Sequence, residues 1–171
     1  YGSGAFMKTP EDAKKLGELM ERIGTFAGKK CKAVITDMNT PLGSNIGNAL
    51  EVKEAVETLQ GKVKGRFYDV CIELAADMLE IAGKGTNDEC RAMAEEAVSS
   101  GKALDVLRKT IRLQGGDERI CDDVSLLPRP EFHYAVRATE DMDIVSFNTE
   151  ELGMTSLLLG AGRTQKGDRI D

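Results

Sequence analysis

The sequence predicts an α/β fold, in the form of a helix-rich partial α/β domain followed by the beginning of a second α/β portion. Near its start, a well-signalled helix precedes a short β-leaning run and a polar loop, which is the unit of an α/β sheet protein. The central stretch then carries apolar residues at helical spacing. Beyond two closely spaced prolines, two short stretches alternate between apolar and polar residues as strands do.

The first element is a glycine loop, Tyr1-Gly-Ser-Gly-Ala-Phe-Met-Lys8, which has no initiator Met and reads as the end of a strand. It predicts that the chain is a piece of a larger protein. Thr9 and Pro10 then provide an N-cap and a first helical residue, and Gly28 provides the stop. Cys31–Thr36 is the β-leaning run, and residues 37–41 form a polar turn.

The middle of the chain predicts four helices. The first runs from Asn48 to Gln60, and a longer one follows from about Phe67 to Ala82. Thr86-x-x-Glu89 has the pattern of a capping box for a third helix through residue 97. The fourth spans residues 103–113, and a glycine pair ends it.

The composition changes at residues 120–130, where two prolines in an acidic stretch mark the best candidate domain boundary. Residues 132–138 and 143–147 are the expected strands of the portion that follows. Thr149 is expected to cap a short apolar helix over residues 152–159, which ends at Gly160.

Bulk properties exclude several classes of protein. A formal charge of -6 without a dense basic patch argues against a dedicated nucleic-acid binder. No apolar run reaches the length of a membrane span. The 4 cysteines are scattered, with no Cys-x-x-Cys pair, which favours reduced buried thiols in a cytoplasmic protein over zinc or dithiol chemistry.

Two loops are candidates for ligand binding. The Gly2-Ser-Gly4 turn, between a strand end and a helix start, could cradle a phosphate or another ligand, and Phe6 could wall a planar ligand. Most such glycine pairs only make turns, and such aromatics usually join the core. Between Asp37 and Glu54, loop carbonyls and one carboxylate could form an oxygen cage for a hard cation, although a capped loop with solvated acids explains the same residues.

The remaining candidates have simpler explanations. His133 is the only histidine, and it lies in a strand-like alternation without a nucleophile or metal partner, so we expect an ordinary strand residue rather than a general base. The turn at Gly160-Ala-Gly-Arg163 could bind an anion, and a glycine helix stop followed by an arginine explains it equally well. These residues predict no catalytic group.

Six segments in a fixed order resemble the bacterial pyrimidine-nucleoside phosphorylase and thymidine phosphorylase family. They are the glycine loop, Ile35-Thr-Asp-Met-Asn39 with Pro41-Leu-Gly43, Gly47-Asn-Ala-Leu-Glu-Val-Lys-Glu54, Ser100-Gly-Lys-Ala103, Gln114-Gly-Gly116 and Leu158-Leu-Gly-Ala-Gly-Arg163. The resemblance implies a C-terminal-half fragment with the fold of the nucleoside phosphorylases and phosphoribosyltransferases. It assigns residues 1–123 to the second part of the large α/β catalytic domain, and residues 124–171 to a linker and the beginning of the C-terminal α/β domain.

The resemblance also implies an activity for the full-length parent. Family members are pentosyltransferases in which inorganic phosphate attacks the anomeric carbon of a pyrimidine nucleoside such as uridine or thymidine. The products are the free base and a pentose 1-phosphate, and the substrates are therefore the nucleoside and phosphate. The family's phosphate and base anchors precede the glycine loop, so the resemblance places no catalytic residue in this chain and predicts that the chain alone is inactive.

By the same resemblance, Phe6 lines the base pocket, and a potassium site draws on the carbonyls of Leu42 and Asn45 and on the carboxylate of Glu54. A cytoplasmic homodimer without an organic cofactor is the implied form of the parent, with neither a nucleic-acid nor a membrane partner. Two other interpretations stay open. One is a phosphoribosyltransferase or nucleotide phosphorylase of the same fold group, and the other is a non-catalytic helical interaction module.

Overall fold

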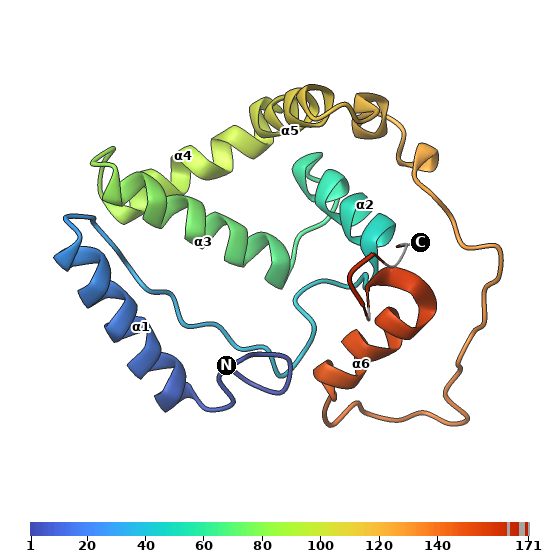
Figure 1. Ribbon diagram of the computed structural model, residues 1–171. Helices are drawn as coiled ribbons and strands as arrows, with labels where there is room; N and C mark the ends of the chain where they lie inside the picture. The colour runs from blue at the N-terminus through green and yellow to red at the C-terminus, as the bar shows by residue number, and fades with distance from the viewer. Residues whose placement is uncertain (164, 168–169, 171) are drawn as a thin grey trace.

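A computed structural model describes residues 1–163, 165–167 and 170 of the chain. The described residues form helices joined by loops and extended segments (Figure 1). The α-helices are α1 (Pro10–Phe26), α2 (Asn48–Leu59), α3 (Arg66–Ile81), α4 (Asn87–Ser99), α5 (Lys102–Leu113) and α6 (Thr149–Ser156). Short helical turns are η1 (Glu118–Cys121), η2 (Val124–Leu126) and the π-helical η3 (Leu157–Ala161).

The predicted helices up to residue 113 are confirmed, and local capping explains where they begin. The Thr9 hydroxyl accepts the backbone N–H of Asp12 at 3.2 Å at the start of α1. At the start of α4, the Glu89 carboxylate accepts the backbone N–H of Thr86 at 2.8 Å, which completes the predicted capping box. The prediction for α6 was wrong in detail, because Asn148 is the N-cap and Thr149 is the first helical residue.

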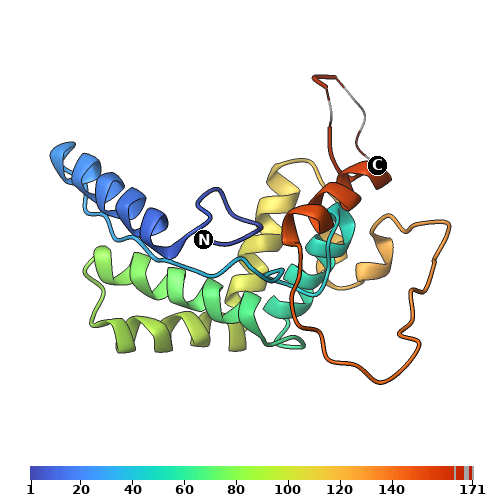
Figure 2. The ribbon, with the colours of Figure 1, turned by 90° about the horizontal axis from the view of Figure 1, so that it is seen from below.

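The buried core residues come from α2, α3, α4 and η1, and α5 contacts α2, α4 and η1. Helices α3 and α4 lie side by side in both views (Figures 1 and 2). The buried apolar residues of the described chain are small or medium-sized: Val56, Ile72, Ala76, Cys90, Ala94 and Cys121. The expectation of buried thiols holds for Cys90 and Cys121, whereas Cys31 and Cys71 are exposed.

The strands of the expected α/β sheet are absent from the described residues, so the α/β prediction is not confirmed at this level. The segments at 31–36, 132–138 and 143–147 are extended but form no ladder. A parallel strand requires a neighbour on at least one side. The segment around residue 37 pairs in this way with the backbone of Tyr1, through two hydrogen bonds. The Tyr1 nitrogen donates to Thr36 O at 2.7 Å, and the Met38 N–H donates to Tyr1 O at 2.6 Å. This is the arrangement of one rung of a parallel ladder, with Asp37 opposite Tyr1.

Helix α1 packs on the extended segment through glycine rather than through its large apolar residues. A Cβ placed on Gly17 would lie 3.0 Å from Ala33 Cβ and 3.6 Å from Ile35 Cδ1, so the segment runs directly over the helix backbone. Among the apolar residues whose helical spacing predicts α1, the large ones are exposed instead: Leu16, Leu19, Met20 and Ile23. The periodicity therefore predicts the helix but not which of its sides packs against the extended segment.

The last third of the chain returns to the N-terminus. After η2, an extended connection leads to α6, which lies beside the N-terminal loop (Figure 1). The side chain of Asn48 at the start of α2 also donates to the carbonyl of Ala161 in η3, at 3.1 Å. None of the helices in the described part of the chain is both long and apolar enough to cross a bilayer.

Candidate functional site

The glycine loop, residues 1–8, is a compact turn closed by its own backbone. The N–H of Gly2 donates to the carbonyl of Met7, and the N–H of Ala5 donates to the carbonyl of Gly2, both at 3.0 Å. Gly2 has a φ of 119°, a conformation that residues with a Cβ rarely adopt. The sequence therefore requires glycine at this position to make the turn.

A second loop, residues 37–47, holds the glycine loop in place. The N–H of Gly4 donates to the carbonyl of Met38 at 3.0 Å, and the N–H of Ser3 donates to Asn39 Oδ1 at 3.1 Å. The two backbones are so close that a Cβ on Gly2 would lie 2.7 Å from the Asn39 nitrogen. The sequence places Asn39 within the polar turn at residues 37–41, and nothing in its local sequence predicts this contact.

Helix α3 in turn anchors the second loop. The Arg66 guanidinium donates to the carbonyl of Asp37 and to the hydroxyl of Thr40. The Asp37 carboxylate accepts the backbone N–H and the side-chain amide of Asn39, both at 2.8 Å. The Asn39 amide thus receives one hydrogen bond from the glycine loop and donates another to its own loop, which fixes its orientation.

Phe6 projects from the glycine loop and is 96% exposed. It borders a hollow of about 380 Å³ lined by Ser3, Gly4, Ala5, Phe6, Lys8 and Glu150. An aromatic side chain of this size normally buries 150–250 Å² when it packs, so full exposure leaves its ring faces free for a planar ligand. The alternative that Phe6 belongs to the core is excluded, whereas its role in a base pocket stays a prediction.

Of the three residues of the predicted cation site, Asn45 and Glu54 come together through the Glu54 carboxylate, and Leu42 precedes Gly43 in the same loop. Glu54 is 6% exposed, and its oxygens accept the backbone N–H of Ser44 at 2.8 Å and of Asn45 at 3.1 Å. A Cβ on Gly43 would lie 2.4 Å from Glu54 Oε2, so the loop follows the carboxylate closely. Glu54 is therefore a buried anchor for the second loop rather than one of several solvated acids.

The Glu54 carboxylate is the oxygen group that could take part in the predicted cation site, and the loop groups hydrogen-bonded to it are backbone N–H donors. A carboxylate has about four lone-pair sites, and two loop amides occupy only two of them. Backbone carbonyls and carboxylates are the oxygen ligands that hard cations prefer. Among the described residues, no three His, Cys, Asp or Glu side chains gather in a way suited to a metal ion, so any cation here would depend on loop carbonyls.

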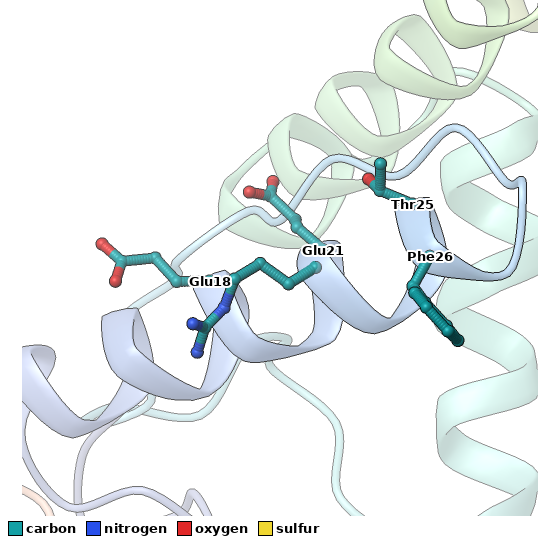
Figure 3. Close-up of a pocket in the computed structure, with 5 residues that line it drawn as sticks. Glu18, Glu21, Thr25 and Phe26 are labelled. Atoms are coloured by element: carbon teal, nitrogen blue, oxygen red, sulfur yellow. The ribbon is translucent and has the colours of Figure 1, made fainter.

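A larger hollow, of about 760 Å³, lies along α1 and not beside either loop. Its lining comes from one helix only, as Figure 3 shows for Glu18, Glu21, Thr25 and Phe26. The Glu21 carboxylate already has a structural partner, because it accepts the N–H of Ala33 at 2.6 Å. A concavity on one helix gives no convergent set of polar groups, so the glycine loop is the better candidate site. The sole histidine, His133, is exposed on the extended connection.

Comparisons with known proteins support a single family. A family profile described as "Glycosyl transferase family, a/b domain" matches residues 1–104. Over 171 residues, 99% of the chain, the sequence is 45% identical to a pyrimidine-nucleoside phosphorylase of Bacillus subtilis (strain 168). Over the same length it is 42% identical to proteins of that name from Staphylococcus aureus strains USA300 and NCTC 8325 / PS 47. The chain spans 40% of the length of each of these relatives.

Proposed function

Because the chain belongs to the glycosyl transferase family, a/b domain, we propose that it acts as part of a pyrimidine-nucleoside phosphorylase. The reaction is the reversible attack of phosphate on the anomeric carbon of a uridine- or thymidine-type nucleoside, a pentosyl transfer. The observation that carries this proposal is the identity of 45% across 99% of the chain to a relative with that name. The "a/b domain" description also agrees with the α/β prediction, although the described residues contain no strand.

Within that enzyme, the glycine loop supplies one wall of the nucleobase site. The loop is fixed by hydrogen bonds to Met38 and Asn39, and it presents Phe6 as an exposed ring beside a hollow. Because the loop is already ordered, binding of a planar base carries no entropic cost for ordering it. Phosphate binding and stabilisation of the departing base need cationic and N–H donors aimed at those groups. We assign these donors to the part of the relatives that this chain does not match.

The potassium site belongs to the same proposal. Leu42 and Asn45 would supply carbonyl oxygens and Glu54 its carboxylate, and a bound cation would add positive charge that ties the second loop to α2. The buried position of Glu54 beside the loop backbone supports this role. A cytoplasmic homodimer completes the proposed form of the enzyme.

A chimaera tests the proposed function directly. Residues 1–171 replace the matching segment of the Bacillus subtilis relative, and phosphate-dependent base release is measured with uridine, thymidine and deoxyuridine in parallel. We expect release of uracil or thymine by the chimaera, and none by the 171-residue chain alone. A chimaera that folds but releases no base with any of the three substrates would contradict the proposal, and transfer from a phosphoribosyl diphosphate instead would favour the phosphoribosyltransferase alternative.

A further inference from the structure

A segment far along the chain, the start of α6, contacts both the glycine loop and the second loop and clamps them together. The first residue of α6, Thr149, donates its hydroxyl hydrogen to the carbonyl of Asn39 at 3.0 Å. Its backbone N–H lies 3.4 Å from the hydroxyl oxygen of Ser3 and donates to it. The same residue therefore bonds to both loops, which are separated from it by 110 and 146 positions in the sequence.

Packing reinforces these hydrogen bonds. A Cβ placed on Gly4 would lie 2.6 Å from Thr149 Cγ2 and 3.0 Å from the carbonyl oxygen of Met38. Gly4 thus lies against both the second loop and α6 on the side where a Cβ would stand, and no larger residue fits without moving one of them. Glycine is required here by close approach, whereas Gly2 requires it for its backbone conformation.

The clamp adjoins the hollow beside Phe6. Lys8 donates to the carbonyl of Ser3 at 3.0 Å and forms an ion pair with Glu150 at 3.1 Å. Both Lys8 and Glu150 line the hollow. This pair is largely exposed and adds little stability. Thr149 contacts the loop carrying Phe6 through its backbone N–H and its methyl group, and its hydroxyl contacts the second loop, to which the glycine loop is hydrogen-bonded.

We propose that Thr149 is a positioning residue for the nucleobase wall. It joins the two loops so that Phe6 keeps one orientation toward the bound base, and it makes the C-terminal segment part of the substrate site. This inference rests on the proposed function. Thr149 has no contact with substrate in this assignment and acts through the glycine loop.

The structural half of the test uses the 171-residue chain. Hydrogen exchange is measured at the amides of Ser3 and Gly4 in Thr149→Val, which removes the hydroxyl and keeps the shape. Thr155→Val is the matched control, because the Thr155 hydroxyl donates only to the carbonyl of Glu151 within α6, at 2.8 Å. We expect exchange about fivefold faster in Thr149→Val, the factor that one neutral hydrogen bond provides, and no change in the control.

The kinetic half uses the chimaera with the Bacillus subtilis relative. A displaced wall weakens binding of ground state and transition state alike, so Thr149→Val should raise KM for uridine about fivefold and leave kcat unchanged. Thr149→Ser retains the hydroxyl and should restore KM to within about twofold of the unsubstituted chimaera. Helix content by circular dichroism confirms that each variant is folded.

The outcomes separate the two hypotheses. An unsubstituted chimaera without phosphorolysis contradicts the proposed function, and the positioning role with it. An active chimaera in which Thr149→Val leaves KM and loop exchange unchanged contradicts the positioning role alone. A fall in kcat with constant KM also overturns it, because that pattern requires an interaction made only in the transition state.

Discussion

Replacing Glu54 with Gln should destabilise the second loop more than the same substitution at any other glutamate of α2. The substitution keeps the volume of the side chain but turns one oxygen into an NH2 group that faces a loop N–H. One hydrogen bond to a charged acceptor is lost, and such bonds contribute about 1.5–3 kcal/mol each. Because Glu54 is 6% exposed, water replaces the lost acceptor poorly. We expect the free energy of unfolding to fall by about 2 kcal/mol.

The assay is thermal and guanidinium unfolding of the 171-residue chain, followed by far-ultraviolet circular dichroism. A loss of about 2 kcal/mol corresponds to a Tm lower by about 4–8 °C for a chain of this size. Glu51→Gln is the matched control, since exposed Glu51 accepts one N–H from Gly47 at 3.0 Å and the Gln carbonyl can still accept it. Faster hydrogen exchange at the amides of Ser44 and Asn45 should accompany the loss. Equal stability of the Glu54 and Glu51 variants would refute the assignment of Glu54 as a buried anchor.

Two further predictions concern helix glycines and acid stability. Gly153→Ala in α6 should stabilise the chain by about 0.8 kcal/mol, because no atom lies within 4 Å of the added Cβ and alanine favours the helix. Gly17→Ala should be less stable than Gly153→Ala by about 1 kcal/mol, because its Cβ would press on the extended segment and offset the same gain; equal Tm shifts would contradict the close packing of α1. Hydrogen bonds from the Arg119 side chain and backbone lower the pKa of Asp117 from 3.8 to about 2. The contribution of this carboxylate to stability is therefore present above pH 3.8 and is lost as the pH falls toward 2. A carboxyl titration by NMR with a midpoint at or above 3.8 would refute that shift.

The helices could be predicted from the sequence because their signals are local. Thr9 with Pro10, and Thr86 with Glu89, satisfy backbone N–H groups within a single turn, so three or four neighbouring residues contain the whole argument. The position of Phe6 beside a glycine turn and the approach of residues 43–45 to Glu54 also follow from short spacings, with the family resemblance as the guide.

The strands and the clamp on the glycine loop could not be predicted in the same way. A β-leaning run such as Cys31–Thr36 becomes a strand only when a neighbouring strand pairs with it, and the described residues offer it one rung, at Tyr1. The contacts of Asn39 and Thr149 with the glycine loop depend on how distant segments meet, and each residue locally resembles an ordinary turn or helix start. Helical periodicity likewise does not say that Gly17 faces the neighbouring segment.

The proposed nucleobase wall is tested most directly by comparing two phenylalanines that are equally exposed. Phe6 and Phe26 are each 96% exposed, but Phe6 borders the hollow of the glycine loop and Phe26 lies at the end of α1. Stacking of a base on an aromatic ring contributes about 1–3 kcal/mol, so in the chimaera Phe6→Ala should raise KM for uridine about tenfold. Phe26→Ala should leave KM unchanged. Equal KM values for the two variants would show that the glycine loop does not form a wall of the base site.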